Sequence, residues 1–341
     1  MKIALLTDAW LPQVNGVVRT LGQVRHEVEK LGHDMLVVHP DLFNTFPCPR
    51  YAEIRLSVLP GRVIADLLDQ EQPDAIHIAT EGPIGLAGRK YCVKRNLPFT
   101  TSYHTKFPEY VQAFAHVPPR WTYAMLRWFH VPAARTLVPT ASMKRELVER
   151  GFDGIRVWTR GVDTELFKPY GKEPLDHLPR PIFVYFGRVS REKNIESFLK
   201  LDLPGTKYVI GDGPARKSLE KKFPNAVFAG YMHGETLARH IAASDVFVFP
   251  SRTDTFGVVM LEALACGVPV AAYPVTGPID VITTSEVGIL DEDLRDAAER
   301  AMKCDPNKCR TYALGYSWLK CAEIFLETLA PISSRTPVRT G

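Results

Sequence analysis

With 341 residues, the chain is long enough for two domains that each bury a hydrophobic core. Hydrophobic side chains make up 45% of the residues and charged ones 23%, which excludes a disordered chain and predicts a soluble globular protein. The net charge is only +4, but residues 84–150 hold 11 Lys and Arg against 3 Asp and Glu. This imbalance favours a surface that meets an anionic partner, and the alternative is a solvated helical face.

No apolar run approaches the roughly 20 residues that cross a bilayer. Met1–Asp8 predicts a first strand, because the segment is too short for a signal peptide. Six cysteines, at positions 48, 92, 266, 304, 309 and 321, lack metal-ligand spacing. We therefore expect reduced thiols, a cytoplasmic location and no metal or cofactor.

Short runs rich in β-branched residues alternate with helical stretches over the first half of the chain. Such alternation predicts an α/β fold with a parallel, doubly wound sheet. The predicted strands are Ile3–Thr7, Met35–His39, Ala75–Ala79, Phe99–Ser102, Thr136–Pro139 and Ile155–Trp158. The predicted helices are Val17–Leu31, Arg62–Gln72, Gly85–Arg95 and Ser142–Arg150.

A proline-rich stretch, Phe167–Pro181, interrupts this rhythm and predicts a domain linker. The alternation then restarts, so we expect a second Rossmann-like domain and a ligand cleft between the carboxyl ends of the two sheets. The later strands are Ile182–Phe186, Lys207–Ile210, Ala226–Ala229, Val246–Phe249 and Val270–Tyr273. The predicted parts are domains 1–168 and 181–312, a C-terminal helix 313–330 that can pack back on the first domain, and a disordered tail 331–341.

The segment Ser251–Val270 carries the most informative pattern in the chain. Asp254 and Glu262 lie eight positions apart, the second in a predicted helix whose start is marked by the turn Thr255–Gly257. Free backbone N–H groups and the helix dipole attract anions at such a start. Two carboxylates flanking it suit a ligand with both hydroxyls and phosphates, such as a nucleotide sugar.

Three further loops follow predicted strands. Gly16 precedes a helix and can bring backbone amides close to a phosphate or sugar. Arg188 and Lys193 can neutralise a diphosphate leaving group in place of a metal. The glycines Gly211 and Gly213 permit close approach of the backbone to a ligand. Ordinary turns and solvated cations are the alternatives.

His104 closes a strand and loop in the first domain. A lone histidine is more often structural than catalytic. Because His104 lies at the carboxyl end of a strand, the two roles are about equally expected here. Ser102 and Thr105 are possible hydrogen-bonding neighbours, and no nucleophile-base-acid triad can be assembled.

The stretch from Pro119 to His130 combines aromatic and basic residues. Trp121, Met125 and Trp128 share one stripe of a helix, and Arg120 and Arg127 border it. Such a face suits a membrane interface, with rings at headgroup depth and cations on lipid phosphates. The alternatives are an internal stripe packed on the sheet and nucleic-acid binding, for which no module pattern is present.

With these motifs placed, the chain resembles the family 4 retaining glycosyltransferases of the GT-B architecture, with two facing Rossmann-like domains. The resemblance runs from Thr7 to about Leu329, and the similar branch contains sulfoquinovosyl diacylglycerol synthases and mannosyltransferases that extend glycosyl diacylglycerols. Besides Ser251–Val270, it rests on Pro12–Val17, Tyr103–Thr105, Arg160–Phe167, Gly187-Arg188 with Glu192–Asn194, and Gly211–Pro214.

The resemblance implies a metal-independent transfer with retention from a nucleoside-diphosphate sugar bound to the second domain, the first domain binding the acceptor. Arg188 and Lys193 would then hold the diphosphate, and Glu262 would accept hydrogen bonds from the ribose. Gly16 would let the first domain approach the diphosphate, and His104 would contact the donor sugar.

The same resemblance implies a sugar-binding role for the start of the helix. Phe256 and Gly257 would offer backbone amides to the sugar, and Val258, Gly211 and Gly213 would also belong to the donor site. Chemically, this is catalysis by positioning and leaving-group stabilisation.

One departure concerns Asp254, where many relatives have Glu as the first carboxylate of the pair. The shorter side chain, and the unusual loop Pro274–Asp280, leave the sugar open. We expect an enzyme at the inner face of the membrane that moves a hexose, with a UDP-sugar favoured, to diacylglycerol or a glycosyl diacylglycerol. The alternatives are GDP-mannose as donor, a soluble acceptor, or a non-catalytic nucleotide-sugar-binding protein. A nicotinamide-dependent oxidoreductase lacks its glycine fingerprint here.

Overall fold

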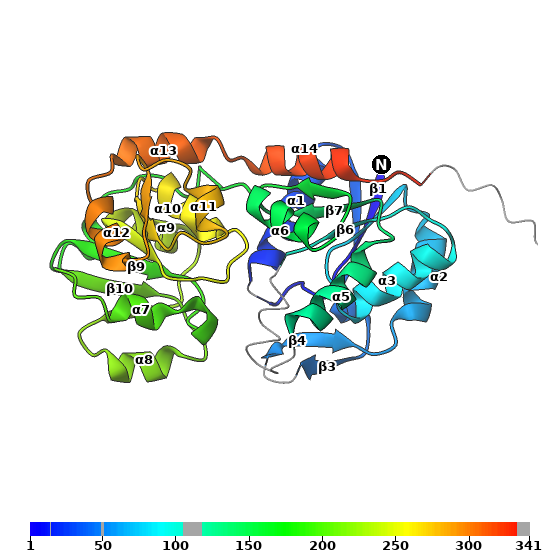
Figure 1. Ribbon diagram of the computed structural model, residues 1–341, viewed down its shortest axis with the longest axis horizontal. Coiled ribbons are helices and arrows are strands. Elements are labelled where there is room, and N and C mark those ends of the chain that lie inside the picture. Colours follow the sequence, from blue (N-terminus) through cyan, green and yellow to red (C-terminus); the bar gives the residue numbers. More distant parts are fainter. Residues whose placement is uncertain (14, 49–50, 105–117, 333–341) are drawn as a thin grey trace, which may run out of the picture. The chain divides into compact units, whose positions relative to one another are not determined.

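The computed structural model describes residues 1–13, 15–48, 51–104 and 118–332. The chain forms two compact units, one of Met1–Thr159 with Trp318–Gly341 and one of Arg160–Ser317 (Figure 1). Val14, Thr105 and residues 333–341 of the tail, which belong to segments named in the sequence analysis, lie outside the described residues.

The first unit is built on a six-stranded parallel sheet with the strand order β2-β1-β5-β6-β7-β8, which confirms the predicted parallel sheet. Each strand lies within one or two residues of its expected position. The strands are β1 (Lys2–Leu6), β2 (Asp34–Val38), β5 (Ala75–Ile78), β6 (Thr100–Ser102), β7 (Arg135–Val138) and β8 (Ile155–Val157). The helices are α1 (Gly16–Lys30), α2 (Gly61–Glu71), α3 (Pro83–Lys94), α5 (Pro119–His130), α6 (Ala141–Glu149) and α14 (Trp318–Thr328), with a short 3-10 turn η1 (Pro40–Leu42).

An antiparallel hairpin in this unit, β3 (Thr45–Cys48) with β4 (Tyr51–Ser57), was not predicted from the sequence. Pro47 and Pro49 interrupt the stretch, and proline in a run of residues argues against a strand. The hairpin lies outside the parallel sheet, where only one partner strand has to be satisfied.

The C-terminal helix α14 belongs to the first unit and packs against α1. One apolar face of this helix is buried, where Ala322 and Phe325 are 0% exposed. Trp158 Nε1 donates to the carbonyl of Cys321 at 2.9 Å. Residues 331 and 332, expected in the disordered tail, are instead tied to the sheet: Pro331 bridges to Ala75, and the Ile332 N–H donates to Asp74 O at 2.7 Å.

The second unit repeats the architecture, with a parallel sheet in the order β11-β10-β9-β12-β13-β14. Its strands are β9 (Ile182–Phe186), β10 (Thr206–Ile210), β11 (Val227–Gly230), β12 (Val246–Phe249), β13 (Val270–Ala272) and β14 (Gly288–Leu290). Its helices are α7 (Ile195–Leu199), α8 (Arg216–Lys222), α9 (Gly234–Ala243), α10 (Val258–Ala265), α11 (Pro278–Val281), α12 (Leu294–Ala301) and α13 (Pro306–Leu314), with 3-10 turns η2 (Glu173–Leu175) and η3 (Arg191–Lys193). The order of each sheet places β1 or β9 between strands that follow it in sequence, as in doubly wound folds.

The proline-rich segment is not a linker between the units, because the boundary falls at Thr159 and Arg160. Phe167 and Leu175 are each 1% exposed and belong to the core of the second unit. Arg310 fixes the segment further by donating to the carbonyls of Thr164 and Phe167 at 2.9 and 2.6 Å. The prolines correctly predicted an irregular backbone, but the buried apolar side chains assign this segment to the second unit.

Within the described part of the chain, every helix is too short or too polar to cross a bilayer.

Candidate active site

The helix start predicted between the two carboxylates is confirmed. Helix α10 begins at Val258, and Gly257 takes the cap position with a left-handed φ of +82° that favours glycine. Gly257 has no side chain that could cap this end, and the first N–H groups of a helix can bind an anion. The Phe256 side chain is 6% exposed and packs in the core, which leaves only its backbone for a ligand.

The fold joins Lys193 to Asp254, although 61 residues separate them in the sequence. Lys193 Nζ donates to Asp254 Oδ1 at 2.5 Å, and the two side chains are 24% and 18% exposed. The other oxygen, Oδ2, is buried and has no hydrogen-bond partner among the described residues. The cation expected to meet the diphosphate and the carboxylate expected to meet the sugar therefore form one half-buried ion pair.

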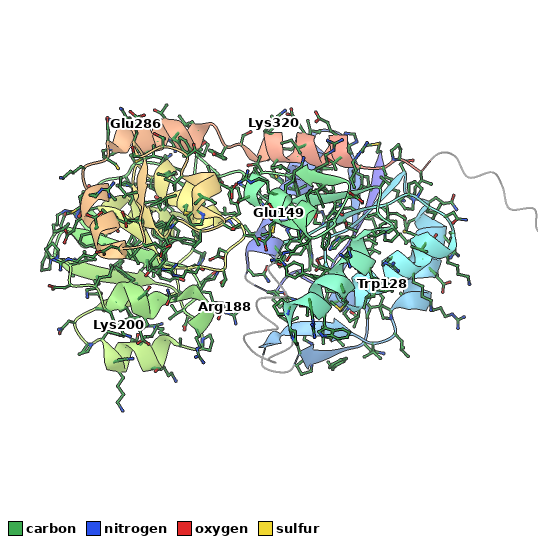
Figure 2. All side chains as sticks on the ribbon, viewed as in Figure 1. Trp128, Glu149, Arg188, Lys200, Glu286 and Lys320 are labelled. Carbon is green, nitrogen blue, oxygen red and sulfur yellow. The ribbon has the colours of Figure 1, made fainter. Side chains whose placement is uncertain are left out.

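Arg188 lies in the loop that follows β9 and projects from it (Figure 2). The backbone around it is fixed, since Tyr185 Oη donates to Arg188 O at 2.8 Å and Val189 N–H donates to Asp212 O at 2.8 Å. The loops after β9 and β10 are thus joined beside the arginine. Arg188 is partly buried, so its guanidinium can still meet solvent or a ligand.

The backbone geometry alone requires glycine at positions 211 and 213, without any contact to a ligand. Their φ angles are +142° and +155°, and a Cβ there would lie 1.9 Å from Gly187 O and 2.4 Å from Val189 O. Only glycine lets the two loops come this close. The predicted donor contacts of these glycines stay predictions.

Glu262 lies inside α10 and is 1% exposed. Burial, with the Glu262 charge as a second cause, raises the pKa of the Cys266 thiol, which follows one turn later. A contact with ribose hydroxyls stays a prediction for this carboxylate.

The unusual loop Pro274–Asp280 lies directly against the Asp254 loop. A Cβ on Gly277 would lie 2.9 Å from Asp254 O and 3.2 Å from Phe256 O. The two features that leave the identity of the sugar undetermined, Asp254 and this loop, are therefore neighbours.

In the first unit, Asn15 Oδ1 accepts hydrogen bonds from the N–H groups of Val17 and Val18, both at 3.0 Å, and so caps α1. A Cβ added to Gly16 would meet no atom within 4 Å. His104 follows β6 at the carboxyl edge of the sheet, and its ring centroid lies 5.8 Å from that of Trp158. Gly16 and His104 both lie in segments that follow the carboxyl ends of strands, where an α/β sheet is expected to bind its ligand.

Helix α5 presents its aromatic stripe to solvent. Trp121, Met125 and Trp128 are 64%, 45% and 54% exposed, while Leu126 and Phe129 on the other side are buried. The alternative of an internal stripe is therefore wrong.

Arginines lie beside this stripe. The Arg89 guanidinium lies 3.8 Å from the centre of the Trp128 ring, and that of Arg120 lies 5.8 Å from the Trp121 ring (Trp128 is labelled in Figure 2). Arg127 donates to Arg150 O at 3.1 Å. We call the set Trp121, Met125, Trp128, Arg120 and Arg127 the α5 face.

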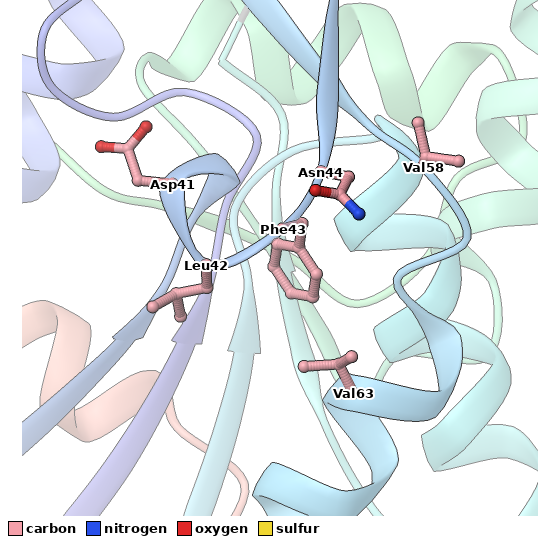
Figure 3. Close-up of a pocket in the computed structure, with 6 residues that line it drawn as sticks. All are labelled: Asp41, Leu42, Phe43, Asn44, Val58 and Val63. Atoms are coloured by element: carbon pink, nitrogen blue, oxygen red, sulfur yellow. The ribbon is translucent and has the colours of Figure 1, made fainter.

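A surface hollow of about 400 Å³ lies elsewhere in the first unit, between η1 and the start of α2 (Figure 3). Four of the six residues that line it are apolar, and three of these, Leu42, Val58 and Val63, are each about half exposed. None of the residues predicted for the donor site lines this hollow. Among the described residues, no three His, Cys, Asp or Glu side chains gather where they could hold a metal ion.

Two Rossmann-like units with parallel sheets are the architecture of GT-B glycosyltransferases, and solved structures of that fold match this chain. The sucrose-phosphate synthase of Thermosynechococcus elongatus superposes with a TM-score of 0.78 at 20% identity, covering 96% of this chain and 97% of that one. The Anabaena protein HepE in complex with UDP-glucose matches with a TM-score of 0.71 at 15% identity, over 96% of this chain and 99% of that one. At these identities the likeness shows the fold alone.

Sequence comparison gives the family. Residues 14–166 match the Glycosyltransferase Family 4 domain, and residues 180–304 match the domain described as Glycosyl transferases group 1. A GDP-mannose-dependent alpha-mannosyltransferase of Mycobacterium tuberculosis is 30% identical over 85% of this chain and 83% of its own length. The chain belongs to glycosyltransferase family 4, and it is a hexosyltransferase.

Two further relatives have different names. The sulfoquinovosyl transferase SQD2 of Arabidopsis thaliana is 33% identical over 72% of this chain, which spans about half (51%) of the plant protein. An alpha-monoglucosyldiacylglycerol synthase of Streptococcus pneumoniae is 26% identical over 90% of this chain and 79% of its own length. The relatives thus include an enzyme named for a lipid product.

Proposed function

We propose that this enzyme transfers a hexose from a nucleoside-diphosphate sugar to diacylglycerol or a glycosyl diacylglycerol at an anionic membrane surface. The observation that supports a lipid acceptor is the α5 face, where two tryptophans and two arginines are exposed side by side on one helix. Interfacial helices combine such rings and cations. The relative named for a diacylglycerol product supports the same acceptor class.

The donor half of the proposal rests on the second unit. Arg188 and Lys193 are proposed to neutralise the diphosphate as the glycosidic bond breaks, at the start of α10. Because the positive charges are supplied by side chains, the proposed reaction needs no metal ion. Glu262 is proposed for the ribose and Asp254 for the sugar hydroxyls.

Two donors compete. The sequence favours a UDP-sugar, whereas the relative from Mycobacterium tuberculosis is named for GDP-mannose. A thermal-shift comparison of UDP-glucose, UDP-galactose, GDP-mannose and ADP-glucose separates them, since a ligand at about 100 times its Kd adds roughly 2.7 kcal/mol of stability. A shift with none of these sugars would contradict the donor site.

The first prediction concerns membrane binding. Replacing Trp121 and Trp128 together by Ser is expected to weaken binding to anionic vesicles about tenfold or more. Complete burial of one large apolar side chain contributes roughly 1.5–3 kcal/mol. The binding free energy of two partly inserted rings should therefore exceed the roughly 1.4 kcal/mol that corresponds to a tenfold change in affinity. Co-sedimentation with phosphatidylglycerol vesicles measures the change.

A matched control is Leu319→Ser, which removes another exposed apolar side chain, on α14. Both variants should keep the thermal stability of the native chain, because surface substitutions usually change it by about 0.5 kcal/mol or less. Equal vesicle binding by the native chain and the tryptophan variant would remove the case for a membrane surface, and transfer to a soluble glycan would then be favoured.

The variant Gly16→Ala distinguishes a structural role of this glycine from a role in donor binding. Because the added Cβ meets no atom within 4 Å, Gly16→Ala should leave stability unchanged or raise it by up to about 1 kcal/mol. If the backbone here approaches the diphosphate, the methyl group should lower kcat/KM about tenfold. Melting curves and initial rates measure the two effects, and an unchanged rate would take Gly16 out of the donor site.

The other class of function is a nucleotide-sugar-binding protein without catalysis. It predicts the same donor-induced thermal shift but no release of nucleoside diphosphate. Measuring that release with and without lipid distinguishes the two.

A further inference from the structure

A buried row of hydrogen bonds in the first unit ends at Glu81, a residue that the donor chemistry does not use. Glu81 Oε1 lies 3.2 Å from His130 Nε2, and His130 Nδ1 lies 2.9 Å from Thr101 Oγ1. Thr101 Oγ1 in turn lies 2.9 Å from Thr136 Oγ1. The row therefore connects two strands of the sheet, β6 and β7, to a carboxylate at their edge.

The carboxylate fixes the direction of these bonds. It can only accept, so His130 Nε2 carries a hydrogen and donates to Glu81. In a neutral ring Nδ1 then accepts from the Thr101 hydroxyl, which itself accepts from Thr136. The His130 side chain is 1% exposed, whereas that of Glu81 is 25% exposed. The buried imidazole thus holds a carboxylate whose remaining surface faces outward.

Glu81 stands three residues after the end of β5, at the carboxyl edge of the sheet, where open α/β sheets bind their ligands. The neighbouring helix start is not free for an anion there. Asp8 Oδ1 accepts from Ile84 N–H at 2.9 Å, and its Oδ2 accepts from Gly85 N–H at 3.3 Å and from the Thr80 hydroxyl at 2.8 Å. The Asp8 carboxylate already occupies the start of α3. A ligand that binds at this edge of the sheet therefore meets the negative charges of Asp8 and Glu81.

We propose that Glu81 binds hydroxyl groups of the acceptor and selects an acceptor that carries no phosphate at that position, with His130 as the residue that positions it. The inference rests on the proposed function, in which the first unit binds a lipid acceptor. A carboxylate accepts hydrogen bonds from the hydroxyls of glycerol or a sugar. It repels a phosphate placed beside it. The substrate class is therefore an uncharged glyceride or glycosyl glyceride.

The test uses the full chain with vesicles that contain diacylglycerol, glucosyl diacylglycerol or phosphatidylinositol. Glu81→Gln keeps an oxygen for His130 but removes the charge. It is expected to raise the KM for the neutral acceptors about tenfold, since hydrogen bonds to charged groups exceed neutral ones by about that factor. It should also reduce the preference for neutral over phosphorylated acceptor. Donor hydrolysis without acceptor should stay unchanged.

Glu149→Gln is the matched control, because Glu149 is an exposed carboxylate of the same unit, at the end of α6 (Figure 2). His130→Phe tests the positioning role, since Phe keeps the packing against Phe129 and Phe152. It should raise the acceptor KM in the native background and add little in the Glu81→Gln background. A merely structural role predicts additive effects instead.

An unchanged acceptor KM and an unchanged preference in Glu81→Gln would overturn the proposal while leaving the proposed function intact. A native enzyme that prefers phosphatidylinositol over both neutral lipids would overturn it as well. Intact donor hydrolysis without transfer to any of the lipids would reject the lipid acceptor itself, and with it the role of Glu81.

Discussion

Replacing Lys193 by Ala should lower hexose transfer roughly 100- to 1,000-fold, the loss expected when one preorganised donor to a developing negative charge is removed. Two physical effects add here. The variant loses the ammonium proposed to neutralise the diphosphate, and it leaves the Asp254 carboxylate, bound by Lys193 at 2.5 Å, without this cation. The local charge becomes more negative by one just where a diphosphate is proposed to bind.

The ion pair between Lys193 and Asp254 provides an internal check on this variant. Adding Asp254→Asn to Lys193→Ala removes the negative charge that has lost its cation and should recover about tenfold of the lost rate, a coupling that independent residues do not show. Lys200→Ala is the matched control, because Lys200 is a solvent-exposed lysine of the same unit that pairs with Glu196 (Figure 2). Initial rates with saturating acceptor measure all four proteins. A Lys193→Ala rate within about threefold of the native rate would be incompatible with the proposed diphosphate site.

Lowering the pH from about 6.5 to 5 should cost the first unit about 2 kcal/mol of its free energy of unfolding. Burial lowers the pKa of His77 from 6.5 to about 3, and its two ring nitrogens lie 2.8 Å from the hydroxyls of Thr100 and Ser102. Between these pKa values the unfolded chain binds a proton that the folded chain does not. The stability is therefore present above pH 6.5 and is lost as the pH falls toward 3, by about 1.4 kcal/mol per unit.

The chain itself supplies the probe for this measurement. All five tryptophans, at positions 10, 121, 128, 158 and 318, lie in the first unit, so urea unfolding followed by tryptophan fluorescence reports on that unit. His77→Gln should abolish most of the slope between about pH 6.5 and 5. Burial raises the pKa of Asp8, which has the opposite sign, but that contribution is common to both proteins and cancels in the comparison. The same slope in both proteins would show that His77 is not the group responsible.

The alternation of strands and helices could be predicted because buried parallel strands are short apolar runs, as in Ile3–Thr7 and Val246–Phe249. The division of the chain could not be predicted from local pattern. Prolines in Phe167–Pro181 predict irregular backbone, but the burial of Phe167 and Leu175 in the second unit depends on residues far away in the sequence. The boundary is a tertiary property.

The candidate site divides in the same way. The start of α10 could be predicted from Gly257 and the apolar residues after it, since helix starts have local signals. The pairing of Lys193 with Asp254, across 61 residues, was not predicted from either segment alone. Glu81 was missed, although it follows a predicted strand, because its partner His130 lies 49 residues away at the end of the aromatic helix.

The exposure of the α5 face could only be decided by the structure. Trp121, Met125 and Trp128 fall on one stripe, and a stripe of that spacing fits a core and a membrane interface equally well. Tyr123, Leu126 and Phe129 occupy the neighbouring positions and are the ones that the fold buries. In a helix with apolar residues on both sides, periodicity does not say which side faces inward.

We propose that a hexose passes from a nucleotide sugar to a neutral lipid through the site that contains Lys193. The direct measurement incubates the full chain with radiolabelled UDP-glucose or GDP-mannose and anionic vesicles that contain diacylglycerol or glucosyl diacylglycerol, and counts the label in the organic phase. We predict lipid-bound label with one of the two donors, and roughly 100-fold less with Lys193→Ala. Label that stays in the aqueous phase with both donors, or lipid-bound label at the native rate from Lys193→Ala, would contradict the proposed transfer.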